Sequence, residues 1–422
     1  MLRSCLACPR VAVIADDLTG ALDAGLQFAE RGLETKVSVG LVSSEAAPIW
    51  VLNADSRNRD REAAAERMRA AARLCAGRQV FKKVDSTLRG NVGAESAALR
   101  DALGFRAALL APAFVEAGRI VSHGRLWVHG VPVDQTPFAR DPQWPAYTAE
   151  VVALASRGLE GERVELISLE AVRREHLALV ACLGDCRLAV AEGETTADLA
   201  AVARAIVEAG PGILLPCGSA GLAAAWADAL DLRGDYAVPW AGAHGPVLVV
   251  SGSHNTVTQG QLLELRRSSS VGWFELEGDA DQGDAAAVGR QIAAALAQGR
   301  DAVLSASFGA LLPGAAARVA ELLGRSAGVA MAEADAIGAR PAGLVLTGGD
   351  TALTVCGALD VQSLTIAHAI EPGIPGAFVA EGAWQGLPVV TKAGGFGSKQ
   401  ALQRALRWIK EGSAMRDDCD GA

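Results

Sequence analysis

Short apolar runs alternate with longer amphipathic stretches along most of the chain. The runs have the length of buried strands, and the stretches between them have helical periodicity. The predicted strands of the first part are residues 11–15, 36–42, 49–53 and 107–114, and the predicted helices are residues 21–32, 60–76 and 92–103. This alternation predicts an α/β fold with a mainly parallel sheet flanked by helices.

Residues 118–150 break this pattern, with four prolines and little helical periodicity. We interpret them as a long insertion with a β-hairpin around residues 126–133. Loops of this length in compact domains usually serve a function. Arg119, His123 and Asp134 are therefore candidates to line a ligand site, although ordinary loop polarity also explains them.

The alternation resumes over residues 163–230 and is interrupted by the proline- and glycine-containing segment 239–246. We place a domain boundary there, which gives an N-terminal domain of residues 1–240 and a C-terminal domain of residues 241–422. In the second domain, three apolar strands each end at a glycine-rich turn that leads directly into a helix.

These three turns, 252–255, 348–351 and 394–398, are the candidate phosphate site. The carboxyl ends of parallel strands share one edge of a sheet, and helix N-termini at that edge attract phosphate groups. A single such turn is commonly only structural, but three together favour nucleotide binding. None has the Walker A spacing, and no GxGxxG follows the first strand, which disfavours a dinucleotide fold.

The N-terminal domain has charged residues where two of its strands end. Asp16 and Asp17 follow the first strand, and the stretch KKVDSTLRGN contains Lys83, Asp85 and Arg89. Carboxylates there can bind or deprotonate a hydroxyl group, and the cations can bind a carboxylate. The alternatives are helix N-capping by the aspartates and a self-neutralising surface loop.

The composition narrows the choice of partners. The 422 residues have a formal net charge of −9 and no basic run, so we expect no binding to nucleic acid. No membrane-spanning run or signal-peptide core is evident, so we expect a cytoplasmic protein without a membrane partner. Cys5 and Cys8, and Cys182 and Cys186, are spaced for metal or redox chemistry, but scattered reduced thiols explain them as well.

Five motifs together resemble the four-carbon acid sugar kinases. They are IADDLTGALDAG at 14–25, KKVDSTLRGNVGAE at 82–95, LTGGDTA at 346–352, PGIPGAFV at 372–379 and VVTKAGGFGSKQAL at 389–402. The resemblance implies phosphorylation of the terminal C4 hydroxyl of a four-carbon sugar acid by ATP. It also implies that the N-terminal domain binds the acid, the C-terminal domain binds the nucleotide, and the active site lies in the cleft between them.

The resemblance transfers roles to individual positions. The implied sugar-acid contacts are Asp16, Asp17, Lys83, Asp85, Ser86 and Arg89. The implied nucleotide contacts are Ser253, Gly348, Gly349, Asp350, Thr351, Gly394 and Gly395. The chemistry of phosphoryl transfer adds further candidates: Asp17, then Asp85, to orient or deprotonate the hydroxyl, Lys83 as the catalytic cation, and Asp350 to hold a Mg²⁺ cofactor.

The motif at 82–95 is more similar to the D-threonate and D-erythronate kinase branch than to the 3-oxo-tetronate branch, which stays open as an alternative. A non-catalytic sugar-acid binding protein, a dehydrogenase with an atypical dinucleotide site and a kinase for an unrelated alcohol are further alternatives. The sequence leaves the oligomeric state open, a homo-oligomer included.

Overall fold

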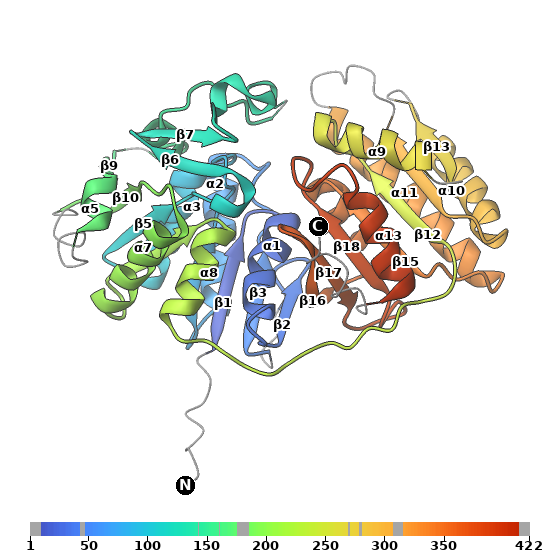
Figure 1. The fold of residues 1–422 in the computed structure, drawn as a ribbon, viewed down its shortest axis with the longest axis horizontal. Coiled ribbons are helices and arrows are strands. Elements are labelled where there is room, and N and C mark those ends of the chain that lie inside the picture. Colours follow the sequence, from blue (N-terminus) through green and yellow to red (C-terminus); the bar gives the residue numbers. More distant parts are fainter. Residues whose placement is uncertain are drawn as a thin grey trace, which may run out of the picture. The chain divides into compact units, whose positions relative to one another are not determined.

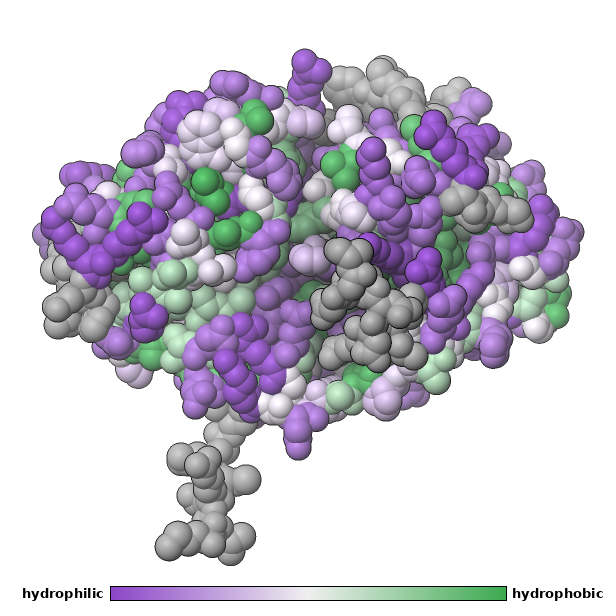
Figure 2. Space-filling model, in the orientation of Figure 1, coloured by the Kyte–Doolittle hydropathy of each residue, from purple (hydrophilic) through white to green (hydrophobic). Residues whose placement is uncertain are grey.

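The chain forms two compact units, residues 1–236 and 237–422, in a computed structural model (Figure 1). The described residues are 10–42, 47–141, 143–159, 161–174, 185–268, 271–277, 281–306 and 315–412. None of the helices within these ranges is long and apolar enough to cross a membrane. On the face drawn in Figure 2, apolar residues lie in small groups among polar ones.

The first unit has a parallel sheet in the order β2-β3-β1-β4-β11-β5-β10-β9. Its strands are β1 Val11–Ala15, β2 Thr35–Ser38, β3 Ile49–Asn53, β4 Gln79–Lys83, β5 Ala107–Ala111, β9 Val164–Ile167, β10 Leu188–Ala191 and β11 Leu214–Gly218. Its helices are α1 Leu18–Ala29, α2 Arg61–Leu74, α3 Val92–Leu103, α4 Val151–Ala155, α5 Leu169–Arg173, α7 Thr196–Ala209 and α8 Ala220–Ala229.

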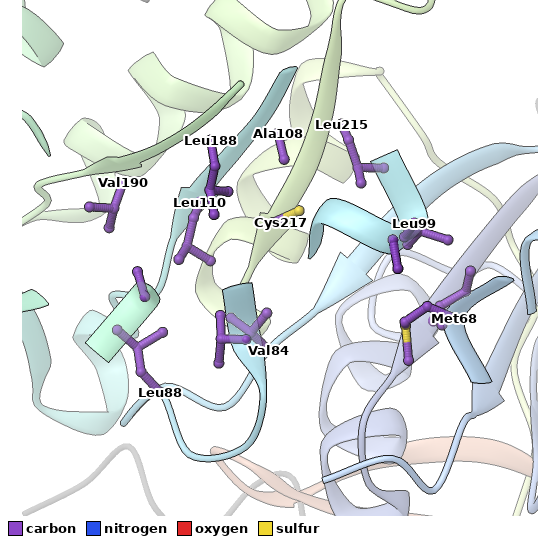
Figure 3. Close-up of a cluster of buried hydrophobic side chains, with 14 of the residues drawn as sticks. Met68, Val84, Leu88, Leu99, Ala108, Leu110, Leu188, Val190, Leu215 and Cys217 are labelled. Carbon is purple, nitrogen blue, oxygen red and sulfur yellow. The ribbon is translucent and has the colours of Figure 1, made fainter. Parts of the chain in front are cut away.

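Burial on both faces explains why these strands read as continuous apolar runs. All five residues of β1 are buried. One face of the sheet packs on α2 and α3 through Met68 and Leu99, which belong to a large apolar core (Figure 3). Helix α8 packs against both α1 and α7.

The predicted insertion forms a small antiparallel sheet of β6 Arg119–Ser122, β7 Arg125–Val128 and β8 Val131–Pro132. The predicted hairpin is confirmed as β7 and β8, whereas β6 was not predicted. Single-turn 3-10 helices at 133–135 and 137–140 follow it.

The second unit has the strand order β13-β14-β12-β15-β18-β17-β16. Its strands are β12 Val247–Ser251, β13 Gly272–Leu276, β14 Ala302–Ala306, β15 Gly343–Thr347, β16 Ser363–Glu371, β17 Ile374–Val379 and β18 Pro388–Lys392. Its helices are α9 Thr256–Ser268, α10 Gln282–Ala297, α11 Ala315–Ala336, α12 Gly349–Ala358 and α13 Ala401–Glu411. The first five strands in this order are parallel, and β17 is antiparallel to both of its neighbours within the unit, β18 and β16. The predicted α/β class is confirmed.

Candidate active site

Asp16 and Asp17, which follow β1, both pair with Arg57. Nε and Nη2 of Arg57 donate to Asp16 at 2.7 and 3.0 Å, and Nη1 and Nη2 donate to Asp17 at 2.8 Å each. The strands β1 and β3 are parallel neighbours, so residues after their carboxyl ends meet. The sequence reasoning missed Arg57, although its place just after the predicted strand 49–53 could have indicated it.

Asp17 is also the N-cap of α1. Its carboxylate accepts hydrogen bonds from the backbone N–H of Gly20 at 2.9 Å and from the hydroxyl of Thr19 at 2.7 Å. Together with Arg57, each of its two oxygens therefore has two donors, which fills the lone-pair positions of a carboxylate. The N-capping alternative is thus realised, and it coexists with a place in the charged cluster.

The loop after β4 is anchored by two apolar residues. Val84 and Leu88 are buried and point into the core of the first unit (Figure 3). Leu88 has a left-handed backbone with φ 57°, a conformation that costs a side-chain-bearing residue about 1–2 kcal/mol. Burial of the side chain offsets this cost and fixes the polar residues between Val84 and Leu88 at the end of the strand.

Asp85 and Arg89 of this loop form a two-point ion pair. Nε and Nη2 of Arg89 donate to Asp85 at 2.8 and 3.0 Å, and Thr87 also donates to this carboxylate. Burial alone would raise the pKa of Asp85, but Arg89 and Arg57 hold it well below its usual range. Such a carboxylate accepts a proton poorly, which favours hydrogen bonding over general-base chemistry at Asp85.

The insertion reaches Arg89 as well. Nη1 of Arg89 lies 3.3 Å from Asp141, and its guanidinium lies 5.4 Å from the ring centre of Phe138. Arg119 is buried, and its charge acts on Asp85. His123, by contrast, is exposed at the β6–β7 turn, and Asp134 is 3.7 Å from Arg125 on β7.

Lys83 lies against the start of α1. A Cβ atom added to Gly20 would be 2.5 Å from Oδ1 of Asp17 and 3.1 Å from Nζ of Lys83, so only glycine permits this close packing. Nζ of Lys83 donates to the carbonyl of Val84 at 3.0 Å. Both Lys83 and Ser86 are buried.

A second layer of charge lies under this cluster. Lys82 and Glu95 are fully buried and pair at 2.8 Å. Burial raises the pKa of Glu95. Asp23, six residues after Asp17 on α1, is buried with one carboxylate oxygen that has no hydrogen-bond partner, and burial raises its pKa to about 6. Lys82, Glu95 and Asp23 were not among the predicted site residues.

The side-chain exposures separate the two layers. Arg89 is 23% exposed and Asp85 12%, whereas Asp16 is 3% and Lys82 0%. A ligand from solvent therefore reaches Arg89 and Asp85 more readily than it reaches Asp16 and Lys82. The cluster mixes cations, carboxylates and hydroxyls, as a polyhydroxy acid requires.

In the second unit the three predicted glycine turns meet. A Cβ atom on Gly252 would be 2.2 Å from Oγ1 of Thr351, and one on Gly394 would be 2.3 Å from Oγ of Ser253. Gly348 has φ 101° and starts α12 without a side-chain cap, and Gly349 is the first residue of that helix. This edge therefore offers helix N–H groups and open backbone, the features that bind phosphate.

Lys392, the last residue of β18, was not predicted as a site residue. It is 1% exposed and lies directly before the third turn. Burial lowers its pKa to about 7, with Glu371 acting in the opposite direction. A lysine that ends an otherwise apolar strand was the available sequence signal.

Asp350 is exposed in the first turn of α12. No group of three or more His, Cys, Asp or Glu side chains that could hold a metal ion occurs among the residues described. An exposed carboxylate beside a phosphate site suits Mg²⁺, which takes one or two carboxylates and completes its shell with phosphate oxygens and water. Of the four spaced cysteines, only Cys186 lies within the described residues, and its thiol is free.

A parallel α/β fold with a cluster of charged and hydroxyl side chains in one unit and converging phosphate-type turns in the other is typical of small-molecule kinases. A family model described as a sugar-binding N-terminal domain matches residues 11–226, and one described as a nucleotide-binding C-terminal domain matches residues 248–402. The chain belongs to the four-carbon acid sugar kinase family, and it is a phosphotransferase that acts on an alcohol group.

Relatives of known activity match over nearly the whole chain. A D-threonate kinase of Salmonella typhimurium is 34% identical, over 95% of this chain and 99% of its own. A 3-oxo-tetronate kinase of Pseudomonas savastanoi is 30% identical, over 95% and 97%. A solved structure from Salmonella typhimurium shares the fold, with a TM-score of 0.74 at 21% identity over 94% of this chain and 99% of that one.

Proposed function

We propose that this enzyme phosphorylates the C4 hydroxyl of D-threonate, or of D-erythronate, with ATP and Mg²⁺. The observation that carries the proposal is the charged cluster at the ends of β1, β3 and β4, in which Arg57 and Arg89 alternate with Asp17 and Asp85. The identity to a D-threonate kinase, higher than to a 3-oxo-tetronate kinase, supports the choice of substrate.

In this proposal the acid lies on the exposed side of the cluster. Arg89 and Asp85, the more exposed members, bind the substrate carboxylate and a hydroxyl, and the buried Lys83, Asp16 and Ser86 complete the charged cluster behind them. The nucleotide is held by three turns: the turn with Ser253, the turn from Gly348 to Thr351, and the turn with Gly394 and Gly395. Asp350 would hold Mg²⁺, which would supply neutralisation of the phosphate charge. The placement of the active site between the two domains stays a prediction.

Asp17 is the residue that we propose orients or deprotonates the C4 hydroxyl. Because its oxygens already have two donors each, it must release one donor to accept a substrate hydroxyl, and the hydroxyl of Thr19 is the uncharged one that can rotate. We expect Asp17→Asn to lower kcat by about 10²–10⁴-fold while the KM for ATP changes little. Equal losses in kcat and in ATP affinity would contradict this role.

The substrate is tested by coupled assays of ATP consumption with D-threonate, D-erythronate, L-threonate and 3-oxo four-carbon acids. We expect kcat/KM to be highest for D-threonate or D-erythronate. Highest activity with a 3-oxo acid would establish the alternative activity, 3-oxo-tetronate 4-kinase. Binding of an acid without ATP consumption would instead identify a non-catalytic binding protein.

A further inference from the structure

The ammonium group of Lys392 is surrounded by hydrogen-bond acceptors, most of them carbonyls of residues 393–396. Its Nζ lies 2.9 Å from the hydroxyl of Thr258 and 3.1, 3.2 and 3.3 Å from the carbonyls of Ala393, Gly394 and Phe396. An ammonium group has three N–H donors, so these four acceptors already use all of them. At 1% exposure Lys392 is also shielded from a ligand in solvent.

Side chains from two other elements bind the same turn. The hydroxyl of Thr258 on α9 donates to the carbonyl of Gly394 at 2.8 Å. The amide of Gln261, one turn further along α9, donates to the carbonyls of Phe396, Gly397 and Ser398 at 3.0, 3.2 and 2.8 Å. Glu371 on β16 accepts from both the N–H and the hydroxyl of Ser398 at 2.7 Å each. The turn is thus held mainly by its carbonyl groups.

Holding the carbonyls determines where the amide hydrogens point. In a trans peptide the C=O and the next N–H point to opposite sides. Since the carbonyl of Ala393 faces Lys392, the N–H group of Gly394 faces away from it. That is the direction needed to present N–H groups to an anion at the end of the sheet.

We propose that Lys392 is a positioning residue of the nucleotide site, which fixes the backbone of residues 393–398 through their carbonyls and does not contact the phosphate chain. This rests on the proposed function. It differs from the usual role of a lysine beside a glycine-rich phosphate turn, which is to contact the phosphates as a point charge. Thr258 acts with Lys392, because its hydroxyl bridges Nζ to the carbonyl of Gly394.

The test compares Lys392→Met, Thr258→Val and Thr258→Ser with the wild type in the full-length chain. Thr391→Val is the matched control, since Thr391 is the neighbouring buried residue of β18 and its hydroxyl has no hydrogen-bond partner. We measure binding of ADP by titration calorimetry, the KM values for ATP and for the sugar acid, and amide hydrogen exchange of residues 393–398 without ligand.

We expect Lys392→Met to weaken ADP binding by about 10–100-fold, which corresponds to the loss of hydrogen bonds from a charged donor. Thr258→Val should weaken ADP binding by about 3–10-fold. Thr258→Ser, which keeps the hydroxyl, and Thr391→Val should both bind ADP like the wild type. Only the KM for ATP should rise, and exchange of residues 393–398 should accelerate in Lys392→Met and in Thr258→Val.

The proposal is overturned if folded Lys392→Met binds ADP as tightly as the wild type. It is also overturned if Lys392→Met loses affinity for ADP while hydrogen exchange of residues 393–398 stays unchanged and Thr258→Val binds ADP like the wild type. That pattern would mean that Lys392 contacts the phosphate directly. If the wild type binds no nucleotide, the proposed function fails. The exchange measurement still decides whether Lys392 orders the turn.

Discussion

At the scale of single residues, Arg57 is the centre of the first site. Its side chain is 12% exposed and compensates the buried carboxylate of Asp16 and the partly buried carboxylate of Asp17. We expect Arg57→Met to lower the free energy of unfolding by about 3–5 kcal/mol, because it leaves buried charge without a partner. Chemical denaturation measures this loss. Arg69→Met, which removes an exposed pair with Glu66, should change stability little, and equal losses in both variants would contradict the interpretation.

Asp23 gives a prediction with a defined pH dependence. Its pKa is raised to about 6 by burial, so the folded state binds its proton more tightly than the unfolded state does. Stability should therefore fall as the pH rises from about 4 to 6, by up to roughly 3 kcal/mol for a shift of about two units. Asp23→Asn should be more stable than the wild type at pH 8 but not at pH 4, as measured by thermal unfolding.

The control for this prediction is Asp235→Asn, which changes an exposed carboxylate. It should show the same small difference from the wild type at both pH values. A stabilisation by Asp23→Asn that is equal at pH 4 and pH 8 would mean that hydrogen bonding, and not ionisation, determines the effect.

The residues of the site differ in how far the sequence could predict them. Asp16, Asp17, Asp85 and Arg89 stand in dense polar stretches directly after strands, and the structure brings them together. Arg57 also lies in a polar stretch after a strand, but its place against the aspartates depends on the pairing of β1 with β3, which the sequence does not show. Burial is a property of packing, so the raised pKa of Asp23 has no sequence signal.

At the scale of elements, close packing of the glycine turns predicts a strict size limit at Gly394. A methyl group there would lie 2.3 Å from Oγ of Ser253 and 3.2 Å from Cβ of Asn255, so the Ser253 hydroxyl must rotate away and Asn255 must give way. We expect Gly394→Ala to raise the KM for ATP by at least about tenfold, since a displacement near 1 Å can cost 10²-fold in rate.

Gly357 provides the matched control, because a Cβ atom there meets nothing within 4 Å. It lies in α12, where alanine is favoured over glycine by about 0.5–1 kcal/mol. Gly357→Ala should therefore be slightly more stable and fully active. An unchanged KM for ATP in Gly394→Ala would show that the turns tolerate a larger separation.

The elements themselves were predictable where strand and helix alternate. The predicted helices 60–76 and 92–103 correspond to α2 and α3 within two residues at each end. The hairpin of β16 and β17 was missed because its motif, PGIPGAFV, resembles a loop of proline and glycine. Gly373, with φ 76°, is the turn residue that converts it into an antiparallel pair.

At the scale of the whole molecule, each unit has its own apolar core, one built on β1, β4 and β5 and one on β12, β14 and β15. Separate cores allow a ligand to stabilise the unit that binds it. The sequence predicted two α/β domains because apolar strands recur on both sides of the segment 239–246. It could not fix the strand order, which depends on contacts between residues far apart in the chain.

The division of the ligands between the units gives the last prediction. A ligand at 100 times its Kd stabilises the state that binds it by about 2.7 kcal/mol. In hydrogen exchange of the full-length chain, D-threonate should slow exchange at residues 16–20 and 84–91, and ADP should slow it at 252–255, 348–351 and 394–398. Protection by ADP of the first set alone would reverse the assignment of the two sites. Because each ligand is added alone, the result tests the two sites separately from phosphoryl transfer.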